Sequence, residues 1–148
     1  MKDAIVKITD NHITDGEKFT CELTTTGSFG MQGGAYIISY DETDEELSGC
    51  VTTLRIEAPE KISMLRSGKY NTEMVFEKDR RHTCFYNTPI GELMMGIYAR
   101  SVSSRLGEKG GTVKFAYTID FNNDLVSENE LTVFVRLRDA AEEDGKEE

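Results

Sequence analysis

A hydrophobic period of two residues constrains this chain more than any other feature. In the segment 113–121, apolar side chains at the odd positions alternate with mainly polar ones at the even positions: Val113, Phe115, Tyr117, Ile119 and Phe121. Alternate residues of a strand point to opposite faces, so the segment predicts a strand with one buried face. Residues 131–137 repeat the pattern. Since no segment has helical periodicity over more than one turn, the sequence predicts little or no helix.

Turn-forming residues interrupt the alternating pattern about every ten positions. Examples are Gly33-Gly34, Ser67-Gly68 and Asn122-Asn123-Asp124. The predicted strands between them cover residues 3–9, 17–27, 34–42, 50–57, 61–66, 73–77, 82–88, 92–104, 111–121 and 128–138. Parallel crossovers need a dozen or more residues, so these short connections predict antiparallel neighbours.

About ten short antiparallel strands must hide their edges by closing or stacking. We therefore expect an all-β fold, a single antiparallel up-and-down barrel of about 8–10 strands, with a two-sheet sandwich as the alternative. The chain has 148 residues, which suits one domain. Residues 1–138 are expected to form the barrel. Residues 139–148 are acidic, contain only two alanines as apolar residues, and are expected to form a flexible tail.

The formal net charge of −10 is concentrated in two segments. Residues 139–148 and residues 41–46 each carry a net charge of −5, which leaves the rest of the chain near neutrality. Binding to a nucleic-acid backbone or to an anionic membrane needs a basic surface. The charge therefore favours neither of these partners.

Cysteine usage and the start of the chain indicate a cytoplasmic protein. Cys21, Cys50 and Cys84 are odd in number and form no C-x-x-C motif, which favours free thiols in a reducing compartment. The first residues lack the apolar core of a secretory signal, and no apolar run is long enough to span a membrane as a helix.

Motifs for catalysis or cofactor binding are absent from the sequence. His82 and Cys84 share a strand face, but a zinc site needs three or four ligands, and His12 lies on another segment. No nucleophile elbow, phosphate-binding loop or dinucleotide fingerprint occurs. We therefore predict no catalytic residue, no metal and no cofactor.

Two charged residues share a strand face with apolar ones. Arg66 follows Ile62 and Met64 at a spacing of two, and Glu42 follows Tyr36, Ile38 and Tyr40 in the same way. If these faces point inward, both charges enter the barrel or its mouth, where a buried charge needs a partner. The alternative is that both lie at strand ends and reach the solvent.

Several short motifs, in this order, resemble the YwiB-like family of small uncharacterised proteins from Firmicutes. They include Thr26-Gly27-Ser28-Phe29, Met64-Leu65-Arg66-Ser67-Gly68 and Tyr86-Asn87-Thr88-Pro89-Ile90-Gly91. The resemblance covers the chain from about Ile5 to Arg138. It implies a calycin-like β-barrel, the architecture of lipocalins and fatty-acid-binding proteins. It implies no activity and no catalytic residue.

The leading hypothesis is binding of a small, partly apolar or anionic ligand inside the barrel. Arg66 and Glu42 would supply the polar contacts, and the wall would consist of Tyr36, Tyr40, Phe76 and Tyr86. One alternative is a protein-interaction module, with a side-chain-filled barrel that docks a protein partner. The other is an enzyme that uses carboxylates without a cofactor. The sequence does not indicate an oligomeric state.

Overall fold

The computed structural model describes residues 1–42, 49–68, 71–88 and 91–138, with the backbone alone for 86–88. Most of the acidic segment 41–46, and the expected flexible tail 139–148, lie outside the described residues. Within the described residues, no helix is long and apolar enough to cross a membrane.

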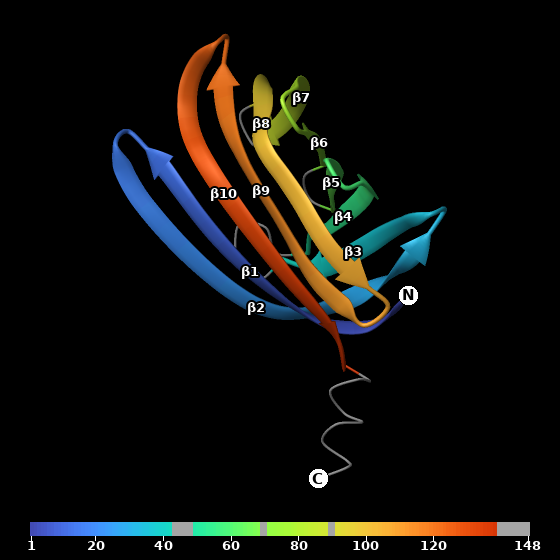
Figure 1. Cartoon of the computed structure of the whole chain (residues 1–148). Helices are drawn as coiled ribbons and strands as arrows, with labels where there is room; N and C mark the ends of the chain where they lie inside the picture. The colour runs from blue at the N-terminus through green and yellow to red at the C-terminus, as the bar shows by residue number, and fades with distance from the viewer. Residues whose placement is uncertain (43–48, 69–70, 89–90, 139–148) are drawn as a thin grey trace.

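Ten antiparallel strands form one closed barrel (Figure 1). Each strand pairs with the next along the chain, and β1 pairs with β10 to close the ring. The predicted all-β, up-and-down barrel is therefore confirmed. The strands are β1 (Lys2–Thr14), β2 (Glu17–Gln32), β3 (Ala35–Asp41), β4 (Val51–Ala58), β5 (Lys61–Ser67), β6 (Thr72–Glu77), β7 (Arg81–Thr88), β8 (Gly91–Gly107), β9 (Gly110–Phe121) and β10 (Asp124–Leu137).

Long and short strands divide the wall of the barrel into two parts. Strands β3 to β7 have six to eight residues each, whereas β1, β2, β8, β9 and β10 have 12 to 17. The hairpins β1–β2 and β9–β10 project at one end of the barrel (Figure 1). Their turns, Asp15-Gly16 and Asn122-Asn123, have positive φ at both residues, as two-residue hairpin turns that match the strand twist require.

The end opposite the two projecting hairpins is packed with apolar side chains. Inward-facing residues of neighbouring strands lie side by side in rows, for example Ile38, Leu54, Met64 and Met74. Phe76, from the adjoining row, is fully buried, and its ring centroid lies 4.6 Å from that of Phe115. This packed half forms the hydrophobic core and the floor on which the site is built.

Strands β6 and β7 meet along a seam with little backbone pairing. Their described residues share one registered pair, Thr72 with Tyr86, whereas β7 pairs with β8 along its whole length. At the other end of the seam, His82 Nε2 lies 3.0 Å from Glu77 Oε1. Side chains therefore connect these two strands where the backbone ladder does not.

Candidate ligand-binding site

A cavity of about 700 Å³ occupies the half of the barrel below the projecting hairpins. The barrel is thus filled at one end and hollow at the other. Most of the cavity wall is apolar and comes from both the long and the short strands: Ile8, Leu23, Met64, Met74, Leu93, Met95, Ile119, Phe121, Val126 and Leu131. Its polar lining residues are Asp10, Cys21, Tyr40, Glu42, Arg66, Tyr117 and Ser127.

The strand register creates a row of polar side chains on the short strands. Tyr40 of β3 pairs with Thr52 of β4, Thr52 pairs with Arg66 of β5, and Arg66 pairs with Thr72 of β6. This row lies one inward position beyond the apolar row of Ile38, because inward positions recur every second residue. On each of these strands, the packed core and the polar row of the site are therefore separated by only two residues.

A hydrogen-bonded group fixes the carboxylate of Glu42 at this row. The fully buried Thr52 hydroxyl donates to Glu42 Oε1 at 2.6 Å. The side chain of Thr52 is also hydrogen-bonded to that of Tyr40. Burial, together with the charge of Glu42, raises the pKa of Tyr40, so its hydroxyl stays protonated at neutral pH.

Arg66 lies beside this group, but the group does not satisfy all of its hydrogen-bond donors. Its Nη2 lies 3.7 Å from Glu42 Oε1, and the two side chains are 19% and 10% exposed. Its Nε is buried and has no hydrogen-bond partner among the described residues. An unmade bond at a buried donor costs about 1–3 kcal/mol. The rest of the guanidinium-bearing side chain lines the cavity, where its donors are available to a ligand acceptor.

Asp10 and Tyr117 bring polar groups to the cavity from the long strands β1 and β9. Asp10 Oδ2 lies 3.7 Å from His12 Nδ1, and the His12 ring stacks on Phe19 with centroids 5.1 Å apart. Asp10 Oδ1 is buried without a hydrogen-bond partner in the described part of the chain. Burial raises the pKa of Asp10, and the neighbouring His12 opposes that shift. Burial likewise raises the pKa of Tyr117.

The structure brings three of the six predicted site residues together in the cavity wall: Arg66, Tyr40 and Glu42. The alternative that Arg66 and Glu42 merely reach the solvent does not fit their low exposure. Phe76 does not line the cavity. It lies in the floor, where its ring centroid is 4.6 Å from that of Tyr117.

Tyr36 lies away from this cavity. Tyr36 stacks on Phe29, with centroids 5.6 Å apart, and lines a different hollow at the packed end near Met1 and Leu137. Its expected place in the ligand wall is therefore corrected: it shares a face with Tyr40, but it lies four residues nearer the other end of the strand. Tyr86 lies in β7 opposite Thr72, and its side chain is outside the described part of the structure.

The sequence reasoning missed Asp10, Thr52 and Tyr117. Asp10 follows Ala4, Val6 and Ile8 at a spacing of two, which is the same signal that selected Arg66 and Glu42. Tyr117 belongs to the clearest alternating segment of the chain. No sequence signal marks Thr52, because a threonine in a strand is ordinary.

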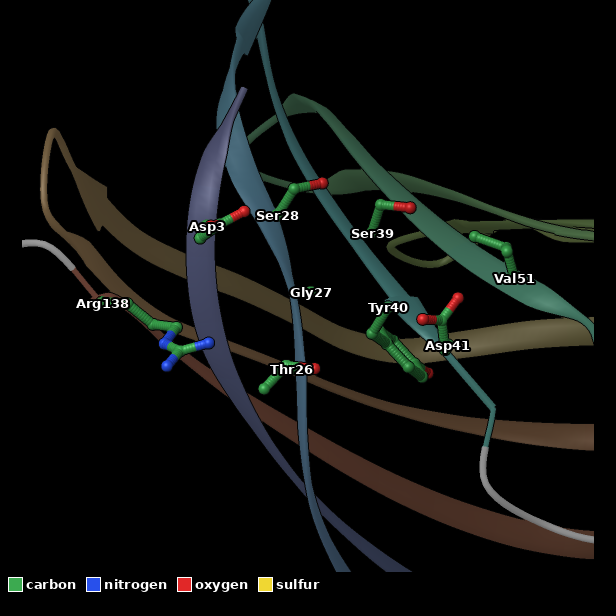
Figure 2. Close-up of a pocket in the computed structure, with 9 residues that line it drawn as sticks. All are labelled: Asp3, Thr26, Gly27, Ser28, Ser39, Tyr40, Asp41, Val51 and Arg138. Atoms are coloured by element: carbon green, nitrogen blue, oxygen red, sulfur yellow. The ribbon is translucent and has the colours of Figure 1, made fainter.

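A second hollow, of about 310 Å³, lies over β1 to β4 and has polar walls (Figure 2). Asp3, Ser28 and Asp41 come from three different strands and do not converge on one point in Figure 2. Nor does any group of three or more His, Cys, Asp or Glu residues in the described ranges form a metal-binding cluster. The three cysteines are free thiols, with Cys21 exposed and the other two buried.

Comparison with known proteins places the chain in a family. A family model described as a domain of unknown function, DUF1934, matches residues 6–133. The chain belongs to this family. It is 24% identical over 119 residues to the uncharacterized β-barrel protein YwiB of Bacillus subtilis strain 168, covering 80% of this chain and 82% of YwiB. The resemblance to YwiB-like proteins is thereby confirmed.

A crystal structure of the YwiB protein from Bacillus subtilis has a similar fold. That structure matches 92% of each chain with a TM-score of 0.83 at 20% sequence identity. The likeness confirms the barrel architecture. YwiB is itself described as uncharacterized, so the function of this chain has to be argued from its own site.

Proposed function

We propose that this protein binds a small, partly apolar molecule in the hollow half of the barrel, with a polar or anionic group of the ligand against Arg66. One observation carries the proposal: an apolar cavity of about 700 Å³ is lined by the guanidinium-bearing side chain of Arg66, which is 19% exposed. Pockets for small molecules are concave and mostly apolar, with a few polar groups that fix the ligand's orientation.

The composition of the wall supports a ligand with an apolar body. Three methionines, Met64, Met74 and Met95, lie among the lining residues. Methionine is unbranched and polarizable, so such a wall adapts to ligands of irregular shape. The packed half of the barrel closes the cavity from below.

This cavity also bears on the two alternatives. A protein-interaction module with a side-chain-filled barrel does not match a barrel that is hollow in one half. An enzyme would need titratable groups arranged around a reacting atom, and no described group of side chains specifically favours that function. Ligand binding is therefore the preferred proposal.

Filling the cavity tests the proposal. Nile red, an uncharged dye that fluoresces in apolar surroundings, is expected to bind saturably to the unaltered protein. Leu23→Trp adds an indole to the cavity wall and is expected to weaken dye binding about tenfold or more. Leu65→Trp is the matched control, because Leu65 is 42% exposed on the outside of β5.

Equal dye binding by both folded tryptophan variants would contradict a site in the barrel. Native mass spectrometry of protein purified from a bacterial host gives a second, independent result. We expect a reproducible excess mass that is lost in Arg66→Met. An apo mass in every preparation, combined with non-saturable dye binding, would argue against a carried ligand.

A cytoplasmic location is part of the same proposal. Its support is the presence of three free cysteines, since a reducing compartment keeps thiols unpaired. Fractionation of the producing cell tests the location. Recovery of the protein outside the cytoplasm would contradict it.

A further inference from the structure

The charges that line the cavity do not leave Arg66 as a free cation. Glu42 lies 3.7 Å from Arg66 and contributes one negative charge against its one positive charge. Asp10 is the remaining charged residue among the described lining residues, and it contributes either a negative charge or, when protonated, none. The described lining residues therefore sum to a neutral or negative charge in both states of Asp10, which disfavours a ligand of net negative charge.

Two polar side chains of opposite type line the same cavity. The guanidinium of Arg66, whose side chain is 19% exposed, offers hydrogen-bond donors, and the carboxylate of Asp10, whose side chain is 37% exposed, offers acceptors when it is ionised. Asp10 and Arg66 both act electrostatically on the hydroxyl of Tyr117 and on that of Tyr40. The two side chains therefore belong to one polar region of an otherwise apolar cavity.

Building on the proposed function, we infer that the ligand is an amphiphile with no net charge, whose polar part both accepts and donates hydrogen bonds. The acceptor lies against Arg66 and the donor lies against Asp10. A primary amide on an aliphatic chain is the simplest chemistry that meets both requirements.

The side chains of Arg66 and Asp10 explain how such a ligand is distinguished from others. A site built to hydrogen-bond a polar group rejects analogues that lack the group, because its own buried atoms are then left unpaired. A carboxylate satisfies Arg66 but places a further negative charge beside Glu42 and Asp10. A tertiary amide satisfies Arg66 but offers no proton to Asp10.

Calorimetric titration with three matched probes tests the inference on the unaltered protein. The probes are octanamide, octanoate and N,N-dimethyloctanamide, all used at pH 8, where octanoate is fully ionised and the two amides are neutral. Octanamide and octanoate have nearly the same shape and differ in charge. We expect octanamide to bind about tenfold or more tightly than octanoate, and several-fold more tightly than the dimethyl amide.

A pair of variants locates the preference. Asp10→Asn removes a negative charge at the cavity and is expected to reduce the ratio of the binding affinity for octanamide to that for octanoate. Asp3→Asn is the matched control, because Asp3 is an exposed residue on the outer face of the same strand. This substitution is expected to leave the affinity ratio unchanged. If Asp10→Asn fails to fold, the comparison of the three probes on the unaltered protein still decides the question.

The outcomes separate this inference from the proposed function. Octanoate that binds as tightly as octanamide would overturn the inference, while the proposed ligand site would stand. Saturable Nile red binding that none of the probes displaces would also overturn it and leave the site intact. Failure of the dye and of all three probes to bind would overturn both.

Discussion

Thr52 shows how one buried hydroxyl determines the chemistry of the cavity. It is fully buried, it donates to Glu42 at 2.6 Å, and it is hydrogen-bonded to Tyr40. These contacts hold the Glu42 carboxylate beside Arg66, at 3.7 Å rather than within hydrogen-bond distance. Thr52 does not line the cavity itself, yet it determines where the two charges of the short wall lie.

Replacing Thr52 with valine tests this role, because valine has the same shape and lacks the hydroxyl. Thr52→Val leaves Glu42 without its shortest hydrogen bond and is expected to lower the free energy of unfolding by about 1–3 kcal/mol. Urea denaturation measures the loss. Thr83→Val, on the exposed face of β7, is expected to change stability by less than about 0.5 kcal/mol. Equal effects of the two substitutions would contradict the role given to Thr52.

At single positions, the sequence predicts well whether a side chain points into or out of the barrel. It predicts less well where that side chain lies along the barrel axis. Tyr36 and Tyr40 share a face, and the period of two cannot separate them. The register with β4 does so, because it places Tyr36 opposite Ile56 in the packed half and Tyr40 opposite Thr52 at the cavity. Register depends on contacts between distant segments, which a single alternating stretch does not contain.

Among the strands, the seam between β6 and β7 is the weakest contact in the ring. One registered backbone pair joins the described residues of these strands, and the Glu77–His82 contact adds a side-chain link. Strands β1 and β10, in contrast, are paired from Ala4–Leu137 to Thr14–Ser127. The closure between the two ends of the chain is therefore stronger than the contact between two strands in its middle.

Hydrogen exchange is expected to show this difference. Amides of residues 72–77 and 81–88 should exchange at least about tenfold faster than those of β9, which is paired along both edges. Mass spectrometry of peptides after brief exchange measures the rates. Equal protection of β6, β7 and β9 would show that the seam is closed by contacts beyond those described.

The number of strands was predictable, and their lengths were less so. Turn residues separate the ten strands clearly, and the ten predicted segments correspond to the ten observed strands. The first strand was expected to end at residue 9, but β1 continues to Thr14. Residues 11–14 lie on the projecting hairpin, where partial exposure on both faces removes the hydrophobic alternation that marks a strand.

For the molecule as a whole, the packed half and the hollow half have different roles. The packed half buries large side chains such as Phe29, Phe76 and Phe115, and it supplies most of the hydrophobic stabilisation. The hollow half contains unpartnered polar atoms, which lower stability. Binding sites often retain such groups at a cost in stability, and Asp10 is a case that can be measured.

Asp10→Asn is expected to raise the melting temperature slightly, by about 2 °C, at pH 8. Burial raises the pKa of Asp10 in the folded state, so ionisation of Asp10 destabilises the fold at every pH above that value. The penalty shrinks as the pH falls through the raised pKa, and it disappears below the ordinary value of 3.8, where both states are protonated. The gain from the substitution should therefore vanish in acid. A melting temperature that falls at pH 8 would show that Asp10 stabilises the barrel.

The position of Cys21 has a practical consequence for identifying the ligand. It is the exposed thiol of the three, and it lies on the cavity wall directly opposite Asp10 in the β1–β2 register. A library of small disulfides can therefore be equilibrated with the unmodified protein. Compounds that fit the barrel will be retained as mixed disulfides, while Cys50 and Cys84 are shielded by burial. The natural chain already carries the chemical handle for a tethering screen of its own cavity.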